Sequence, residues 1–223
     1  MSSANAHPPA VERPAGAWRS PLALGATGVV GVLAAAVVTG ATAPLVLSDP
    51  GPLVRWGLPL ATVTAHVSSA VTLGLLVLAA FLMPETTRTN RRVEATRLGA
   101  VSAFVWAVAS GVSLLFTFAD LAGLPLTDPA LLPPLGGYVF SLDTTPILAI
   151  SSALAMVVAV WGAVARSRAT MAWLAAFSLV AIVIGALTSH SGGSATHEDV
   201  VNSMGLHLLD VSVWVGGLVG VLV

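Results

Sequence analysis

The sequence contains no cysteine and no lysine, and it carries little charge of either sign. The absence of cysteine excludes disulfides, thiolate metal sites and cysteine nucleophiles. Charged residues make up 9% of the 223 residues and hydrophobic residues 56%, and the mean hydropathy is +0.92. Soluble domains are about a quarter charged, so this composition is typical of a membrane protein. The chain also lacks the basic patch that nucleic-acid binding requires.

Catalytic signatures are missing as well. The chain has no G-x-S-x-G, no P-loop, no H-E-x-x-H and no Gly-rich dinucleotide fingerprint. We therefore expect no hydrolase or transferase chemistry and interpret the protein as a non-enzyme. An ATP-driven pump is excluded for this chain alone, because it contains no soluble domain that could bind the nucleotide.

Six apolar runs predict an all-α integral membrane protein, a polytopic bundle of about six transmembrane helices. Each run has about the 20 residues needed to cross a hydrocarbon core of about 30 Å. Residues 1–19 are rich in proline and predict a disordered cytoplasmic tail, and residues 20–223 form the predicted transmembrane domain. The runs cover residues 21–47, 53–83, 96–119, 139–165, 170–189 and 201–223.

Both ends of the apolar region leave alternatives open. The first run contains Ala41-Thr42-Ala43, which resembles a signal-peptide cleavage site, but the apolar stretch before this tripeptide is longer than the usual 7–15 residues. A retained helix is therefore the favoured interpretation. The last run stops at Val223 without a charged or aromatic anchor, which suggests that the transmembrane domain continues in a longer protein.

The arginines predict the orientation. With the N-terminus inside, Arg55 alone lies outside, which follows the positive-inside rule. The outer face then carries carboxylates and histidines that attract cations. The cytoplasmic arginines are Arg13, Arg19, Arg88, Arg91, Arg92, Arg97, Arg166 and Arg168, and the outer acidic residues are Asp49, Asp120, Asp128, Asp143, Glu198, Asp199 and Asp210.

Residues 187–219 hold most of the side chains that can bind a metal. Three of the five histidines, His190, His197 and His207, occur in this stretch. On a helix, Met204, His207, Asp210 and Trp214 share one face. An aspartate inside an apolar run is costly and indicates function. Asp210 could orient the His207 imidazole for a metal or be a ligand itself, although the two residues could also pair only to satisfy each other.

The two remaining histidines of the stretch stand at the start of a polar loop and within it. His190 ends the fifth run, and His197 precedes Glu198 and Asp199. The loop is short enough to bring all three histidines together, but their spacing matches no sharp metal signature. A solvated surface role for His197 remains the alternative, and Asp199 could cap the sixth helix.

Two further features stand inside apolar runs. His66 lies midway along the second run, where it could relay an ion, bind haem iron or bond to Thr62 or Ser69 on its own face. The glycines at 216, 217 and 220 include a GxxxG spacing, which predicts that another helix approaches this segment closely. His7 lies in the tail and is expected to be inert.

Three segments carry a resemblance to a known family. The run from His207 through Trp214 to Leu218 resembles the H-x6-W-x-G-G-L signature of the bacterial copper-resistance D (CopD/YcnJ-type) membrane proteins. Ala186–His190 resembles that family's A-L-x-G-H helix end, with Ser189 in place of glycine. Residues 49–59 are similar to actinobacterial members fused to a CtaG-like cytochrome oxidase assembly domain, which implies that this chain is the N-terminal part of such a protein.

The resemblance implies a copper-binding protein of the bacterial cytoplasmic (inner) membrane, with His190 and His207 carried over as ligands. From the residues, the full predicted metal set is His190, His197, His207, Asp210 and Met204, and a thioether at Met204 favours Cu(I). The implied partners are the bilayer, the copper ion, and an extracytoplasmic copper chaperone or oxidase assembly factors. Two alternatives stay open: a haem-bearing electron-transfer protein using His66, and an assembly scaffold without its own metal.

Overall fold

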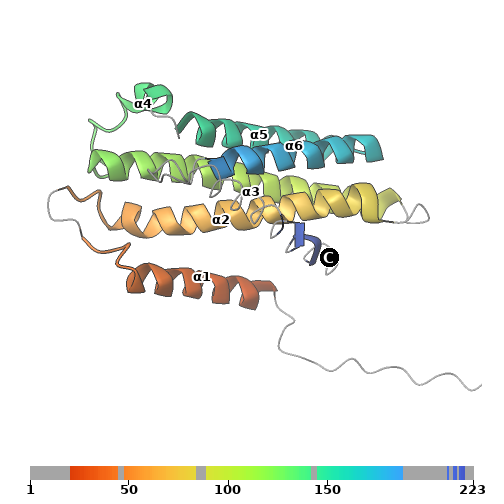
Figure 1. Cartoon of the computed structure of the whole chain (residues 1–223), viewed down its shortest axis with the longest axis horizontal. Helices are drawn as coiled ribbons and strands as arrows, with labels where there is room; N and C mark the ends of the chain where they lie inside the picture. Colours follow the sequence, from red (N-terminus) through yellow and green to blue (C-terminus); the bar gives the residue numbers. More distant parts are fainter. Residues whose placement is uncertain are drawn as a thin grey trace, which may run out of the picture.

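The computed structural model describes residues 21–44, 48–83, 89–141, 145–187, 210, 213–214 and 216–218, and every regular element in these ranges is helical. This agrees with the predicted all-α class. The elements are α1 (Pro21–Val38), α2 (Pro52–Val77), the π-helical turn η2 (Leu78–Leu82), α3 (Thr89–Ala122), α4 (Leu135–Ser141), α5 (Thr145–Val164) and α6 (Arg168–Leu187). The described residues of 210–218 are also helical and lie beside α2 (Figure 1).

Two continuous helices are long and apolar enough to cross a membrane, Pro52–Leu82 and Arg91–Ala122. Shorter apolar helices cover Thr27–Val38, Leu148–Val164 and Arg168–Ile184. Within the described residues, two of the six predicted spans therefore meet the full criterion of length and composition. The count of six spans stays a prediction.

Local residues explain where the structure departs from the predicted boundaries. The run 139–165 is divided, because α4 ends at Ser141 and α5 begins at Thr145. Pro146 occupies the first turn of α5, where a missing N–H leaves no helical hydrogen bond unmade. The buried hydroxyl of Thr145 donates to the carbonyl of Tyr138 at 3.0 Å and joins the two helices.

The other shifted boundaries have equally local causes. Helix α3 begins seven residues before the predicted start at 96, because its polar first two turns are compatible with a helix although they are not apolar. Helix α1 ends at Val38, well before the predicted limit of 47. Gly40 follows with φ at 73°, a left-handed conformation that terminates helices and favours glycine.

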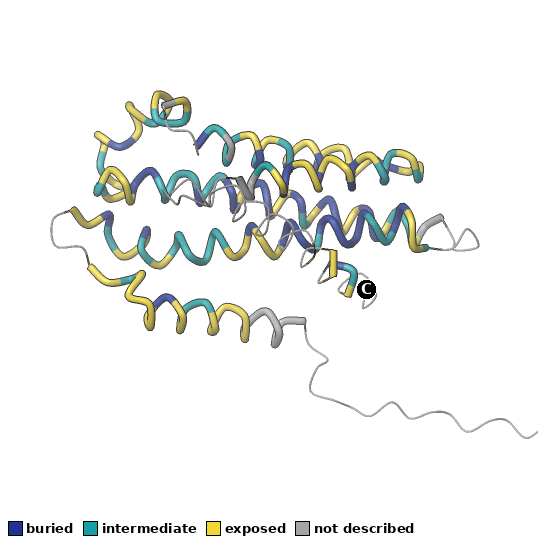
Figure 2. Tube along the Cα trace, viewed as in Figure 1, coloured by how far each residue is buried: buried dark blue, intermediate teal, exposed yellow. Residues whose placement is uncertain are grey.

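Helices α2, α3, α5 and α6 form an antiparallel bundle whose interior is lined by small and apolar side chains (Figures 1 and 2). Small interior residues let helices approach closely in an apolar medium. The outward side chains of the same helices are largely apolar as well, for example Val101, Phe104 and Trp173. The main core consists of Ala65, Leu73, Leu76, Ala103, Trp106, Ala107, Ala109, Ala155, Val158, Ala159, Ala165, Leu174, Ala175, Ala181 and Ile182.

Hydroxyl groups join the bundle helices across their interfaces. Ser102 of α3 donates to the carbonyl of Ser68 in α2 at 2.9 Å, and Thr72 of α2 lies 3.4 Å from the carbonyl of Gly99. Ser152 of α5 donates to Ala107 in α3 at 2.8 Å, and Ser151 donates to Ala181 in α6 at 3.2 Å. In an apolar medium, apolar contacts alone distinguish poorly between alternative helix pairings. Side-chain-to-backbone bonds of this kind help to select one pairing.

Arginines gather at one end of the bundle, where α2 ends and α3 and α6 begin. The guanidinium of Arg92 donates to the carbonyl of Met83 at 3.0 Å, and that of Arg168 donates to Ala80 at 3.2 Å. Both arginines thus satisfy carbonyls that the end of α2 and η2 would leave open. Cationic groups at a helix C-terminus are also favoured by the helix dipole.

Candidate metal site

The predicted site lies only partly within the described part of the chain. Met204, His190, His197 and His207 are outside it, as are the nearby acidic residues 198 and 199. Asp210 is described: it is helical and exposed. Among the described residues, no three His, Cys, Asp or Glu side chains form a group that could hold a metal. The coordination of a metal by the predicted set therefore stays a prediction.

The segment that carries Asp210 contacts α2 through glycine. A Cβ on Gly216 would lie 2.9 Å from both Cα and N of Gly74, and it would also meet the carbonyl oxygen of Ala70. A Cβ on Gly74 would in turn meet the backbone of Gly216. This confirms the prediction that another helix approaches the glycine-rich segment closely. Gly217 has open space at the corresponding position.

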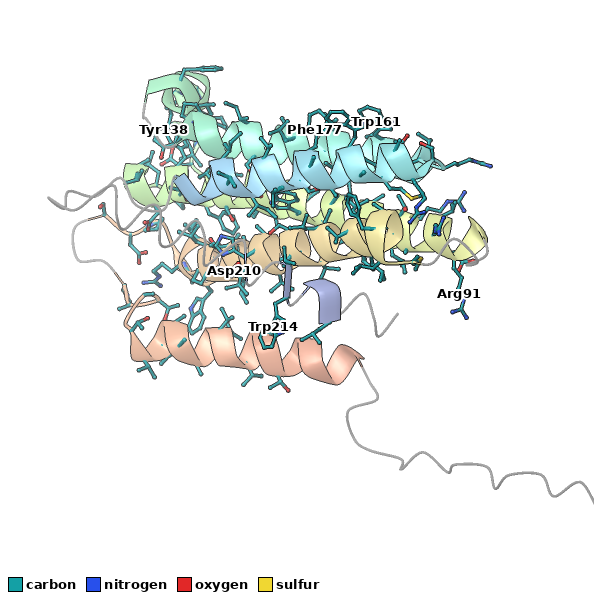
Figure 3. The ribbon with its side chains drawn as sticks, turned by 45° about the vertical axis from the view of Figure 1, so that its right-hand side comes forward. Arg91, Tyr138, Trp161, Phe177, Asp210 and Trp214 are labelled. Atoms are coloured by element: carbon teal, nitrogen blue, oxygen red, sulfur yellow. The ribbon has the colours of Figure 1, made fainter. Side chains whose placement is uncertain are left out.

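The face predicted to hold metal-capable side chains is turned away from this glycine contact. On a helix, Asp210 and Trp214 lie on one face, and Gly216 lies on another. Trp214 is 69% exposed and points to the α1 side of the segment (Figure 3). Asp210 and Trp214 thus remain accessible while Gly216 fixes the segment against α2.

His66 stands on the face of α2 that carries this segment. His66, Ala70 and Gly74 follow one another at intervals of four residues and form one stripe along the helix. The His66 side chain is exposed, whereas Ala70 and Gly74 are buried. One interpretation paired the imidazole with Thr62 or Ser69. In the structure, the Ser69 hydroxyl instead donates to the backbone carbonyl of His66 at 2.8 Å, and nothing in the described residues hydrogen-bonds to the imidazole.

At the end of the bundle opposite the arginines, acidic side chains shape the backbone. Asp49 accepts a hydrogen bond from Gly51 N at 2.9 Å, and its other oxygen lies 3.1 Å from Nη1 of Arg55. The lone arginine predicted on this side is therefore paired, and the pair fixes the start of α2. The sequence signal is the Asp-Pro-Gly-Pro corner followed by an arginine in the first helical turn.

Two other acidic residues of this end are described. Asp128 accepts a hydrogen bond from Ala130 N at 2.8 Å and so stabilises a turn of the connection between α3 and α4. Asp120 lies in the last turn of α3, as predicted, and is exposed. Asp143 lies outside the described residues. Of the described acidic residues in this region, Asp120 and Asp210 have side-chain carboxylates that form no hydrogen bond or ion pair with a described residue and are accessible to a cation.

The acidic end also holds the protein's one tyrosine. Tyr138 of α4 packs against Phe118 of α3 with ring centroids 4.4 Å apart, in a small apolar cluster with Val54 and Leu131. Burial in this cluster raises the pKa of the Tyr138 phenol above its ordinary value of 10.0. The cluster packs on the first turn of α2 through Val54, at the acidic end of the bundle.

Comparison with known proteins gives one match. The family model described as "Copper resistance protein D-like, N-terminal domain" matches residues 49–198, which is more than half of the chain. The matched region begins at the aspartate that pairs with Arg55 and includes α2, α3, α5 and α6 with His66, His190 and His197. No match was found among curated proteins or among solved structures.

Proposed function

The chain belongs to the copper resistance protein D-like family and is a copper-resistance-related membrane protein, and from this premise we propose that it binds copper at the outer face and passes it into or across the cytoplasmic membrane. The observation that carries the proposal is the family match over residues 49–198, which contains two of the three predicted histidine ligands. The physiological purpose would be copper uptake, copper tolerance or supply of copper to an oxidase.

In the proposed mechanism, the outer carboxylates first raise the local cation concentration. His190, His197 and His207 then coordinate the copper ion, and Met204 adds a soft donor that favours Cu(I). Asp210 completes the site or orients the imidazole of His207. The exposed position of Asp210 supports this role, because its carboxylate is not used by another described residue.

The same proposal sets the position of the protein in the membrane. The arginine end, where Arg92 donates to the carbonyl of Met83 and Arg168 to that of Ala80, would face the cytoplasm, and the acidic end would face outward. An extracytoplasmic copper chaperone or an oxidase assembly factor would meet the chain at the acidic end. No catalysis of covalent chemistry is part of this function.

The test is the copper content of the detergent-purified full chain, measured by elemental analysis. We expect near-stoichiometric copper in the wild type and its loss in the double variant His190→Ala/His207→Ala. His7→Ala is the matched control, since it removes a histidine from the tail and should leave the copper content unchanged. Absence of copper from a folded wild-type protein would refute the proposal and direct attention to a haem or scaffold role, which the visible spectrum separates.

The pH dependence gives a second test of histidine ligation. Histidine binds metal only in its neutral form, so copper affinity should fall as the pH drops below about 6. Asp210→Asn should lower the affinity by about 10–100-fold, the usual loss when a group that orients a metal ligand is removed. An affinity that does not change between neutral and mildly acidic pH would contradict histidine ligation.

A further inference from the structure

We infer that His66 is a further copper ligand, located in the middle of the membrane-spanning part of α2 beside the segment that carries Asp210. This inference rests on the proposed function, because it takes copper as the ion. It assigns the ion a second position, one helix away from the outer histidines and nearer the middle of the membrane.

The register of the two helices carries the inference. Gly216 meets α2 between Ala70 and Gly74, so the crossing is centred near residue 72. His66 comes six residues before that centre, and Asp210 comes six residues before Gly216. Asp210 lies nearer the N-terminal end of α2 than Trp214 does, so the segment runs in the same direction as α2 (Figure 3). At about 1.5 Å per residue, both side chains stand at the same depth, about 9 Å above the crossing.

The helical rotation places both side chains on the same side of the helix pair. With about 100° per residue, His66 is turned about 60° from the direction of the crossing and Asp210 about 120°. In two parallel helices these rotations bring both side chains out on one side of the plane that contains the helix axes. An imidazole and a carboxylate therefore lie on the same side of the helix pair.

Neither side chain has a described partner that would explain its position. Both are exposed, and no hydrogen bond to the His66 imidazole exists in the described residues. An ionisable side chain at this depth is costly and is normally satisfied by a partner, by water or by an ion. A structural histidine would instead be expected to bond to Ser69 or Thr62, and the Ser69 hydroxyl is engaged by the His66 carbonyl.

The charge of the pair selects the cation. A neutral imidazole and an ionised carboxylate together carry one negative charge, which a monovalent ion balances. A divalent ion would leave a net positive charge in a medium of low dielectric, which is unfavourable. Imidazole is a good ligand for copper, so Cu(I) suits this pair of side chains better than Cu(II) or a hard divalent ion. Copper moves between the outer site and His66 by ligand exchange, without a change of oxidation state.

The experiment measures copper stoichiometry in two ways on the full chain in detergent: as purified, and after titration with Cu(I) to saturation under reducing conditions. The wild type should bind one more equivalent at saturation than as purified. His66→Ala should lose that extra equivalent and keep the as-purified content. Val67→Ala, a change at the next residue of α2, which is 55% exposed, is the matched control and should behave as the wild type.

Two further observations distinguish ligation from a structural effect. His66→Met supplies a soft donor from the same backbone position and should restore the extra Cu(I), whereas a merely structural histidine would not be replaced in this way. Equal saturation of the wild type and a folded His66→Ala would refute the inference and leave the outer site intact. An intense visible haem band lost in His66→Ala would also overturn it. A wild type that binds no copper at all would refute the proposed function together with the inference.

Discussion

The two faces of α2 are packed by different means. On one face, a hydroxyl group joins α2 to α3, because Ser102 donates to the Ser68 carbonyl at 2.9 Å, and the Thr72 hydroxyl donates to the same carbonyl at 2.7 Å. On the other face, Gly74 meets Gly216 without any side chain between the two backbones. The first face keeps its polar groups satisfied inside the bundle, whereas the second leaves His66 exposed beside the glycine contact.

This difference teaches where a membrane helix can carry function. A hydroxyl-bonded face uses its polar groups to hold the fold and leaves none for a ligand. A glycine contact fixes the distance between two helices and uses no polar group at all. Ionisable side chains beside it, such as His66 and Asp210, are then held in place by the backbone and remain free to bind an ion.

The largest effect is expected when the glycine contact is broken. Gly216→Leu would drive a side chain into the backbone of Gly74 and Ala70. Overpacking of this kind costs about 1–3 kcal/mol even where side chains can yield, and here backbone atoms are in the way. We expect the segment to leave α2 and both copper equivalents to be lost, as measured by copper content and by the free energy of unfolding in mixed micelles.

Gly217→Leu is the matched control for this change. The neighbouring glycine has nothing within 4 Å of the added Cβ, so the same substitution should leave copper binding close to that of the wild type. If both leucine variants lose copper equally, the contact between Gly74 and Gly216 does not hold the site, and the comparison between the two faces fails.

The hydroxyl-bonded face should respond more weakly and without loss of copper. Ser102→Ala removes one bond to the Ser68 carbonyl, and bonds of this type contribute about 0.6 kcal/mol in membrane proteins. Ser113→Ala is the control, because the Ser113 hydroxyl is buried and makes no hydrogen bond within the described part of the chain. Its removal should leave the free energy of unfolding unchanged or slightly higher. A greater loss from Ser113→Ala than from Ser102→Ala would contradict this assignment.

The sequence predicted the helical class, the position of the long spans and the close approach at the glycine-rich segment, because hydropathy and small residues act locally. It did not predict the break between α4 and α5, since one proline in an apolar run is compatible with both a helix start and a continuous helix. The use of Gly216 and not Gly217 could not be predicted either. That choice depends on how the segment is rotated against α2, which is a property of the assembled bundle.

The metal set predicted from the sequence stays a prediction, because four of its five residues lie outside the described part of the chain. His66 was recognised as an intramembrane histidine, but its relation to Asp210 depends on the register that the glycine contact sets. The pair of Asp49 with Arg55 was missed as a contact, although both residues stand in the segment that resembles the family. Residue types and spacing indicate which atoms can bind a metal, while tertiary contacts decide which of them meet.

Removing the interactions of Asp49 at the start of α2 tests whether the packing of both faces of this helix depends on how the helix begins. Asp49→Ala removes the bond to Gly51 N and the ion pair with Arg55. A lost side-chain-to-backbone hydrogen bond contributes about 1 kcal/mol, and a partly exposed ion pair adds less than that. We expect a loss of about 1 kcal/mol in the free energy of unfolding, with copper content reduced in proportion to unfolding alone. A selective loss of copper from the folded variant would instead place Asp49 in the copper site.

The smallest effect concerns Tyr138, which reports on the acidic end alone. Because burial raises the pKa of this phenol above 10.0, the folded state holds the proton more tightly than the unfolded state. Its contribution to stability is therefore fully present below the unfolded pKa and is lost as the pH rises through the folded value. As the only tyrosine, it can be followed by ultraviolet absorbance, and its midpoint should lie above 10.0. Since Tyr138 packs with Phe118 and Val54 away from the glycine contact, the midpoint should be the same in Gly216→Leu. A midpoint lowered by that variant would mean that the two faces of α2 are not independent.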